Sequence, residues 1–291
     1  MIRKRFVSPH RVFVCVVYVV AFVAPAFLFA QARPKRIISL VPNVTEMLFA
    51  IGAGPQVVAV SNYDVEPPAV RSLPTVGALL DPDTEKILAL RPDLVITYGS
   101  QSDLQSQLRS ARIPFFDYRH GGLDQITSTM RTLGVTTGHQ AEAETAARNL
   151  EAAIAAVKAR VAGQPRPRTL LVFGREPGSL RNIYASAGRG FLHDMLIAAG
   201  GDDMLGDIDK ESVQISTEMI LARQPDVILE LNAANQLNDA DLKKIVDPWM
   251  TLSSVPAVKN RRVVVLLGAA MSVPGPRVAH SIEKMARALH P

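Results

Sequence analysis

Cysteine and tryptophan are almost absent from this chain, which has one residue of each type among its 291 residues. Because that cysteine, Cys15, lies in the N-terminal segment, we expect no disulfide and no thiol chemistry after residue 32. Four signatures of enzymes and nucleotide-binding folds are missing as well: a G-x-G-x-x-G turn after the first strand, a P-loop, G-x-S-x-G and H-E-x-x-H. We therefore expect a protein that is not an enzyme.

Acidic residues are absent before Arg33, and this first segment differs in composition from the rest of the chain. Basic residues at positions 3, 4, 5 and 11 precede an apolar run at residues 12–29, and Ala30-Gln31-Ala32 follows as a small-x-small cleavage site. The pattern predicts a secretory signal peptide, residues 1–32, that is cut after Ala32. An uncleaved membrane anchor is the alternative, because the apolar run is almost long enough to span a bilayer. Pro25 and the Ala-x-Ala site favour cleavage.

A large net charge is also lacking beyond that segment. The chain from Arg33 onward keeps 28 of the 32 Lys and Arg residues together with all 27 Asp and Glu residues, so its net charge is +1. This balance predicts no nucleic-acid partner. Hydrophobic residues make up 48% of the sequence, which is enough to bury a core in each of two domains.

A repeated unit organises the rest of the chain. Residues 84–96 read TEKILALRPDLVI, and residues 217–229, 133 positions later, read TEMILARQPDVIL, with seven identities in thirteen. In each copy an N-cap candidate, Asp83 or Ser216, precedes a short helix, a Pro-Asp pair ends the helix, and an apolar strand follows. The repeat predicts two similar halves.

Apolar strands alternate with helices in both halves, which predicts parallel sheets. Further strands are expected at residues 36–41, 57–60, 113–116, 169–173 and 262–267, and the final helix is expected to open at residues 271–277. Residues 138–163 are rich in Ala and Glu without an internal Gly or Pro, which predicts one rigid helix about 35 Å long. The predicted fold is α/β, with two Rossmann-like lobes, residues 33–138 and 164–291, bridged by a single long helix, residues 139–163.

Polar and aromatic residues follow the predicted strands. In parallel sheets ligands bind beyond the carboxyl ends of the strands. Those ends carry Pro42-Asn43, Tyr63, Tyr98 and residues 118–120 in the first half, and residues 174–177 and 230–232 in the second. The two sets are therefore expected to face each other across a cleft.

Several motifs occur together in one order along the chain. They are RIISLVPNVTEMLFAIG at residues 36–52, SNY and PP at 61–68, both T-E-x-I-L-A-x-x-P-D units, FGxxP at 173–177, GRGFL at 188–192, AGG at 199–201 and PGPR at 274–277. With them the chain resembles the periplasmic substrate-binding proteins of vitamin B12, haem and ferric-siderophore ABC importers, and most of all the cobalamin-binding branch. The resemblance implies the class III architecture, a single bridging helix and a periplasmic location.

The resemblance also implies a membrane partner. Glu85 and Glu218, at equivalent positions of the two repeats, would dock onto arginines of the importer's permease dimer, which works with an ATPase, while the binding protein itself is a monomer. Each glutamate stands in the first turn of a predicted helix, where a carboxylate complements the helix dipole. An ordinary helix-start glutamate explains either residue alone, and their repetition in both halves favours docking.

For the ligand, the resemblance implies contacts from the strand-end loops and no resident cofactor or metal. The matching residues are Pro42, Asn43, Tyr63, Tyr98, Arg175, Glu176, Met271 and Arg277. A corrin is a broad, mostly apolar ring fringed with amides, which suits aromatic faces and a few hydrogen-bonding groups. The chain departs from some cobalamin binders in having Leu79 in place of a tryptophan and Glu66 in place of a tyrosine.

His120 is a further candidate, because an imidazole after a strand can reach the cobalt or iron of a ligand. A solvated loop histidine is the alternative. Haem binders of this class offer a tyrosine where this chain has Gly77-Ala78-Leu79, which argues against haem. Anionic siderophores remain open, because Arg119, Arg175, Arg189 and Arg277 are either anion-binding residues or ordinary loop arginines. His139, His193, His280 and His290 lie on or beside predicted helices, so a zinc or manganese carrier is not expected.

Overall fold

The computed structural model describes residues 33–291, which form one compact unit. The predicted signal peptide lies outside the described residues. Within residues 33–291, no helix is both long and apolar enough to cross a membrane. The predicted division into lobes at residues 138 and 163 stays a prediction, although the chain does form two separate sheets.

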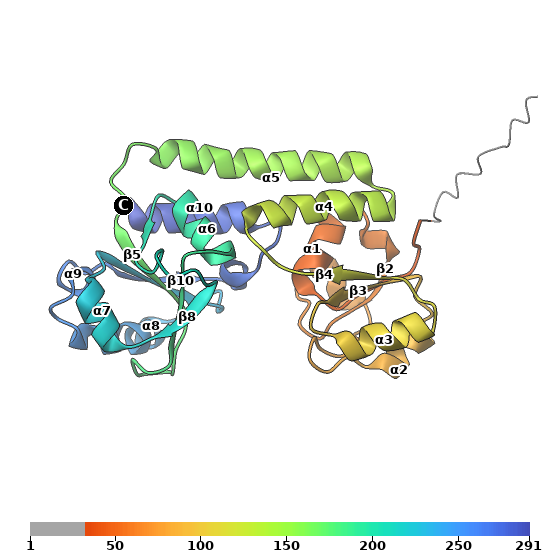
Figure 1. Ribbon diagram of the computed structural model, residues 1–291, viewed down its shortest axis with the longest axis horizontal. Helices are drawn as coiled ribbons and strands as arrows, with labels where there is room; N and C mark the ends of the chain where they lie inside the picture. The colour runs from red at the N-terminus through yellow and green to blue at the C-terminus, as the bar shows by residue number, and fades with distance from the viewer. Residues whose placement is uncertain (1–32) are drawn as a thin grey trace, which may run out of the picture. The chain divides into compact units, whose positions relative to one another are not determined.

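The first sheet has four parallel strands in the order β2-β1-β3-β4 (Figure 1). Its strands are β1 (Ile37–Ser39), β2 (Val57–Val60), β3 (Leu94–Tyr98) and β4 (Phe115–Tyr118). Its helices are α1 (Pro42–Ala50), α2 (Thr84–Ala89), α3 (Ser102–Ser110) and α4 (Leu123–Thr137), with short 3-10 turns at Gly54–Gln56 and Pro68–Ser72. The parallel sheet predicted for this half is present. β4 starts and ends two residues later than predicted, which makes the buried Tyr118 its last residue.

The second sheet is mixed, in the order β10-β9-β5-β6-β8, with β7 paired to β5. Its strands are β5 (Arg168–Gly174), β6 (Ile183–Ser186), β7 (Asp202–Asp203), β8 (Ser212–Ile215), β9 (Val227–Asn232) and β10 (Val263–Leu267). β5, β9 and β10 are parallel, as predicted, whereas β6 pairs antiparallel with both β5 and β8. β6 and β8 were not predicted from the sequence, because both are short and lack a continuous apolar run.

The remaining helices cover this second sheet and its edges. They are α6 (Phe191–Ala198), α7 (Thr217–Arg223), α8 (Asp239–Val246), α9 (Pro256–Lys259) and α10 (Val278–Leu289), with 3-10 turns at Asp247–Thr251 and Ala269–Ser272. The final helix was expected to open at residues 271–277. It begins only at Val278, because the prolines at 274 and 276 cannot donate helical hydrogen bonds and Met271 belongs to the preceding 3-10 turn.

The predicted bridging helix is α5 (Gln140–Val161), 22 residues long. α5 lies beside α4 and then beside α10 (Figure 1). Its buried residues, Ala143, Ala147, Leu150, Ile154, Val157 and Val161, recur at three- and four-residue spacing and form one apolar face. All of these side chains except Ala147 belong to a hydrophobic cluster that also contains Ile37 of the first sheet and Leu171 of the second. Residues of both sheets thus pack in one continuous hydrophobic core with α5.

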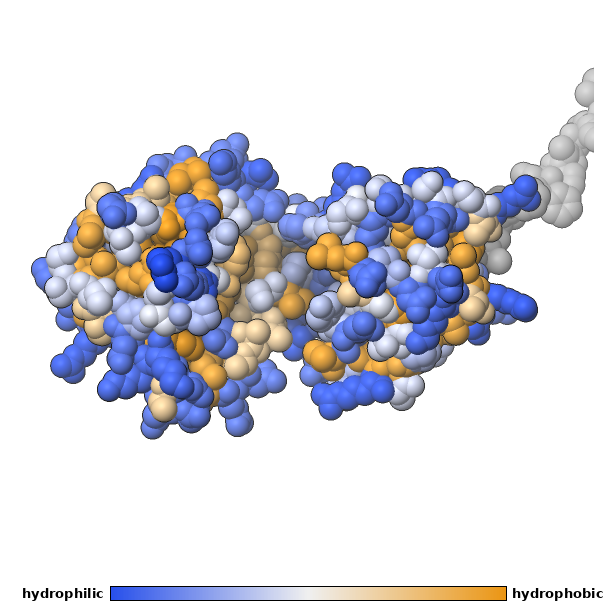
Figure 2. Space-filling view, turned by 90° about the horizontal axis from the view of Figure 1, so that it is seen from below, coloured by the Kyte–Doolittle hydropathy of each residue, from blue (hydrophilic) through white to orange (hydrophobic). Residues whose placement is uncertain are grey.

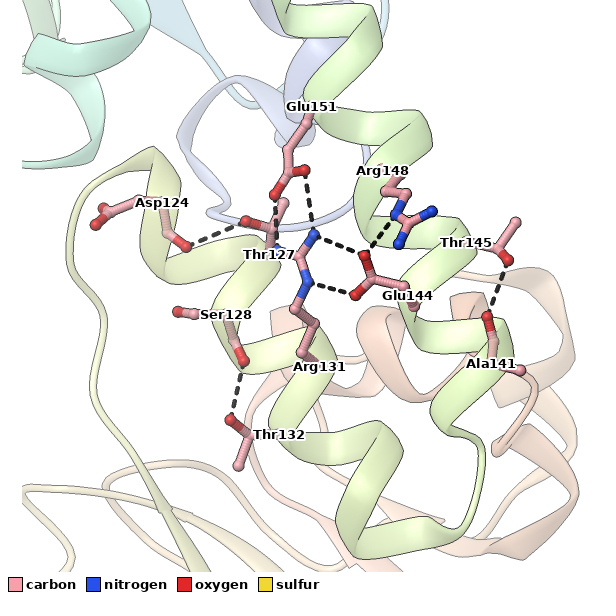
Figure 3. A network of polar contacts seen from close by, with 10 residues as sticks. All are labelled: Asp124, Thr127, Ser128, Arg131, Thr132, Ala141, Glu144, Thr145, Arg148 and Glu151. Atoms are coloured by element: carbon pink, nitrogen blue, oxygen red, sulfur yellow. Dashed lines mark hydrogen bonds and ion pairs between the residues drawn. The ribbon is translucent and has the colours of Figure 1, made fainter.

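An ion-pair network joins α4 to α5 on the outer surface (Figure 3). Arg131 of α4 donates to Glu144 and to Glu151 of α5, each at 2.7 Å, and Arg148 donates to Glu144 at 2.6 Å. Hydrogen bonds from Arg131 and then Arg148 lower the pKa of Glu144 to about 2. The network adds a set of exposed ion pairs between the two helices.

Both repeats adopt the predicted unit. Asp83 accepts a hydrogen bond from the Lys86 amide at 2.9 Å, and Ser216 accepts one from the Met219 amide, so both predicted N-caps are confirmed. The residue before each proline, Arg91 or Gln224, has a positive φ near 50°, which turns the chain sharply out of the helix.

Candidate functional site

A cavity of about 430 Å³ lies between the two sets of strand ends. Its volume falls within the range of small-molecule sites. Figure 2 shows the hollow on the side of the molecule away from α5, with apolar side chains on both of its walls. The lining residues are Val41, Pro42, Asn43, Leu79, Tyr98, Tyr118 and His120 from the first half, and Phe173, Phe191, Leu192, Glu211, Ser212, Ser272 and Pro274 from the second.

The local fold explains the first wall. Pro42 opens α1 directly after β1, and proline is favoured at that position because its fixed φ suits a helix start. Tyr98 and Tyr118 are the last residues of neighbouring parallel strands, so their rings lie 6.1 Å apart at the same edge of the sheet. The carboxyl ends of β1, β3 and β4 therefore supply this wall, as the sequence predicted for such sheets.

Asn43 connects the two walls at the floor of the cavity. Its side-chain amide donates to the Tyr118 hydroxyl at 2.7 Å and to the carbonyl of Pro274 at 3.0 Å. Burial raises the pKa of Tyr118 to about 12, so its hydroxyl stays protonated at any physiological pH. Both amide protons of Asn43 are thus used to hold protein groups, and the residue positions Tyr118.

His120 links the walls at a second point. Its Nδ1 is hydrogen-bonded to the Tyr98 hydroxyl, and its Nε2 lies 3.1 Å from a carboxylate oxygen of Glu211. The rings of Tyr98 and His120 are stacked, with centroids 5.8 Å apart and planes at 14°. Burial, with the Glu211 charge nearby, raises the pKa of Tyr98. In the neutral imidazole, Tyr98 donates to Nδ1 and Nε2–H donates to Glu211.

Five of the predicted ligand residues lie outside this cavity. Tyr63 is 68% exposed on a loop, and Met271 is 1% exposed in the core. Arg277 makes a paired hydrogen bond to Glu46 of α1 at 2.7 and 2.8 Å, and Glu176 pairs with Arg181. Pro42, Asn43, Tyr98 and His120 do line the cavity.

Arg175 is the fifth of these residues and is part of a buried cluster. Its side chain is only 4% exposed, and its Nε lies 3.0 Å from Glu230, which is close enough for an ion pair although the two groups are not aligned as a hydrogen bond. The guanidinium also lies over the Trp249 ring, and the Trp249 indole N–H donates to Glu230 at 2.7 Å. This arrangement stabilises the second lobe.

The other two candidate anion-binding arginines also have carboxylate partners. Arg119 pairs with Asp117 at 3.3 Å, and Arg189 pairs with Asp209 at 3.2 Å and with Glu211 at 3.5 Å. Neither lines the cavity. None of the four arginines considered for a siderophore is thus a free cation on the cavity wall.

The second wall contains residues that the sequence analysis did not select. Phe191 and Leu192 stand in the GRGFL motif, which could have indicated them, and Phe173 ends an apolar run. Glu211 had no such signal. It lies beside Gly190, whose φ is +90° and where an added Cβ would lie 3.0 Å from the Glu211 side chain.

The predicted docking glutamates lie away from this cavity. Glu85 and Glu218 are exposed in the first turns of α2 and α7. A hydrogen bond with Ser216 lowers the pKa of Glu218, which keeps it charged. Within residues 33–291, no three His, Cys, Asp or Glu side chains gather closely enough to hold a metal ion.

Comparison with known proteins identifies relatives of the same architecture. A family model described as periplasmic binding protein matches residues 37–269. The vitamin B12-binding protein of Yersinia pseudotuberculosis is 30% identical over 240 residues, which cover 81% of this chain and 84% of that protein.

Two solved structures from other organisms have the same fold. The periplasmic vitamin B12 binding protein BtuF of Vibrio cholerae superposes with a TM-score of 0.73 at 25% identity, covering 88% of this chain and 96% of that chain. The periplasmic haem-binding protein RhuT from Roseiflexus sp. RS-1 superposes with a TM-score of 0.72 at 28% identity, covering 88% and 98%. The expected class III fold is therefore confirmed, and the chain belongs to the periplasmic binding protein family, of the type that serves vitamin B12, haem and siderophore uptake.

Proposed function

We propose that this protein captures cobalamin, or another corrinoid, between its two lobes and delivers it to the permease of an ABC importer. The observation that carries the proposal is the cavity itself. Its walls are formed by apolar and aromatic side chains from both lobes, with a few polar groups at defined points. A corrin requires that combination, because its ring is broad and apolar and its fringe carries amides. The similarity to vitamin B12-binding proteins supports the same ligand.

Ligand titration tests the proposal directly. The protein, produced from the full-length reading frame, is titrated calorimetrically with cyanocobalamin, and with haemin and a ferric siderophore in parallel. We expect sub-micromolar binding of cyanocobalamin. The variant Phe191→Ala removes part of one apolar wall and is expected to weaken binding, whereas Val135→Ala, an exposed site on α4, serves as the control. Binding of haemin or the siderophore without cobalamin would contradict the proposal.

Haem is the second candidate, and the paired Tyr98 and His120 favour it. Tyrosine and histidine are both axial ligands of haem iron, and these two side chains stack on the cavity wall. A Soret shift on adding haemin, lost in Tyr98→Phe combined with His120→Ala, would support this alternative. An unchanged haemin spectrum in the wild-type protein would exclude iron coordination by either side chain.

The permease is the expected partner, and Glu85 and Glu218 are the proposed contacts. Both carboxylates are exposed in equivalent helical turns, where arginines of a membrane partner can reach them. Charge reversal at both positions is expected to abolish binding to the permease in proteoliposomes and to leave ligand affinity unchanged. Docking that survives the double change would disprove this role.

The remaining assignments follow from the same proposal. The protein works in the periplasm as a monomer without an activity of its own, and its N-terminal segment directs secretion. The shared core beneath α5 supports a small hinge motion rather than wide opening. Solution scattering with and without ligand tests this point, and a large decrease in the radius of gyration on binding would contradict it.

A further inference from the structure

One charged side chain sets the polarity of the cavity. Of the described residues that line it, Glu211 is the only acidic one, and neither lysine nor arginine is among them. The Glu211 side chain is 44% exposed, so its carboxylate is accessible at the mouth while it bonds to His120. A ligand that occupies the cavity therefore meets a hydrogen-bond acceptor with a negative charge on the second wall.

Neighbouring cations do not cancel this charge. Arg189 lies 3.5 Å from Glu211, but it is also 3.2 Å from Asp209, so these three side chains together carry a net charge of −1. Arg175 and Arg277, the other arginines expected at the ligand, are paired with Glu230 and Glu46 outside the cavity. An anionic ligand would thus find no free guanidinium on the wall.

The fold also holds Glu211 in place. Its backbone carbonyl accepts from the Ala187 amide at 3.3 Å, directly before β8 starts. Gly190 provides the space for its side chain, because a Cβ there would lie 3.0 Å from Cγ of Glu211. The backbone of Glu211 is thus held at the start of β8, and its carboxylate reaches His120 and Arg189.

Resting on the proposed function, we propose that Glu211 is a specificity-determining residue that selects neutral ligands with amide or hydroxyl donors and rejects ligands that place carboxylates or other anions at this wall. Donor groups of a neutral ligand can replace His120 as partners of the carboxylate. Carboxylates of a ligand would face a like charge on this wall, which disfavours their binding. The fringe of a corrin carries neutral amides, whereas haem carries two propionates.

The test compares four ligands and two charge reversals. Cyanocobalamin and a ferric trihydroxamate are neutral, and haemin and a ferric tris-catecholate are anionic. Glu211→Lys reverses the charge on the cavity wall, and Glu142→Lys makes the same change at an exposed position of α5 that does not line the cavity. Affinities come from calorimetry on the protein produced from the full-length reading frame.

We expect Glu211→Lys to shift the ratio of anionic to neutral affinity by about ten-fold or more toward the anionic ligands. Glu142→Lys is expected to shift the ratio by less than about three-fold, because its charge lies in solvent away from the cavity. If Glu211→Lys does not fold, as judged by thermal melting, Glu211→Gln takes its place. Glutamine has nearly the shape of glutamate but no charge, so this variant is expected to move the ratio of anionic to neutral affinity in the same direction. Equal shifts in the two reversals, or none in either, would overturn the role of Glu211.

The two proposals fail in different ways. A wild-type protein that binds the neutral trihydroxamate but not cyanocobalamin disproves cobalamin capture and leaves the role of Glu211 standing. If the wild-type protein binds cyanocobalamin and the Glu211 variants rank the four ligands in the same order, the role of Glu211 is disproved and cobalamin capture stands. A wild-type protein that prefers haemin or the catecholate disproves both.

Discussion

The two copies of the repeated unit, residues 84–96 and 217–229, have the same scaffold but end differently. In both, a capped helix is followed by a residue with positive φ, and a Pro-Asp pair comes directly after that residue. The aspartate then accepts backbone hydrogen bonds at the start of the neighbouring strand: Asp93 from Lys35 and Arg36, and Asp226 from Arg168. The repeat thus fastens two parallel strands together in each lobe.

The two copies differ in the residues at the ends of their strands, β3 and β9. In the first copy β3 continues with Thr97 and Tyr98, and Tyr98 reaches the cavity. In the second copy the residue equivalent to Thr97 is Glu230, which is buried against Arg175 and Trp249. One lobe therefore uses its strand end to line the cavity, while the other uses it to stabilise its own core. A shared scaffold does not imply a shared role for the residues that follow it.

The largest expected effect on stability is at position 230, which is equivalent to position 97 in the other repeat. Glu230→Ala leaves the buried Arg175 without its counter-charge and the Trp249 indole without its acceptor, so we expect a loss of about 3–5 kcal/mol in the free energy of unfolding. Thr97→Ala removes one acceptor of Gln105, at 3.1 Å, and is expected to cost about 1 kcal/mol. Urea unfolding at neutral pH measures both. Similar losses would show that the two strand ends contribute equally.

The next prediction compares the Pro-Asp pairs. Asp93 accepts two backbone hydrogen bonds at 2.7 Å, whereas Asp226 accepts one at 3.0 Å. We expect Asp93→Ala to cost about 2 kcal/mol and Asp226→Ala about 1 kcal/mol, because bonds to a carboxylate are stronger than neutral ones. Asparagine at each site keeps one acceptor oxygen and is the matched control. A larger loss at Asp226 would reverse the comparison.

A smaller effect is expected at the helix caps. Asp83 lies 2.9 Å from the amide that it caps, and Ser216 lies 3.4 Å from its own. Asp83→Ala is expected to cost about 1 kcal/mol and Ser216→Ala about half as much. Thermal melting of both variants measures the difference. Threonine at position 216 retains a capping hydroxyl, and a melting temperature as low as that of the alanine variant would disprove the capping role.

The smallest effect concerns α4 and α5, which have no second copy. The pKa of Glu144 is lowered to about 2 in the folded protein, so its ion pairs stabilise the fold above the ordinary glutamate pKa near 4.3, and this contribution is lost as the pH falls toward 2. The difference in melting temperature between the wild-type protein and Glu144→Gln is expected to shrink from pH 6 to pH 2. Glu142→Gln, an exposed neighbour on α5, is the control. A difference independent of pH would contradict the assignment.

Much of the scaffold could be predicted from local patterns. The repeated helix starts, the strand β2 and the long α5 follow from capping residues, apolar runs and the absence of breakers, all of which act over a few residues. β6 and β8 could not be predicted in this way. Each strand has only four residues. Tyr184 is exposed between two buried neighbours, whereas Gln214 is exposed beside the buried Ile215 alone, and the two strands are stabilised by pairing with each other.

Of the residues that line the cavity, only some on the first wall could be predicted from the sequence. Pro42, Asn43, Tyr98 and His120 follow parallel strands, so their meeting at one edge of the sheet is a consequence of topology. Arg175 follows a strand end and Arg277 stands in the PGPR motif, yet each pairs with a buried glutamate, Glu230 or Glu46, outside the cavity. No local pattern distinguishes an arginine that meets a ligand from one that meets a distant glutamate.

The sequence by itself determined the α/β repeat, the two capped helices with their exposed glutamates and the rigid helix between the sheets, because propensity, capping and apolar periodicity are local properties of the chain. Only the tertiary structure decided the chemistry of the cavity. Glu211 meets His120 across 91 residues of sequence, and Arg277 meets Glu46 across 231. Such contacts depend on how two sheets pack on one core, which fixes where each charge lies and which partner neutralises it.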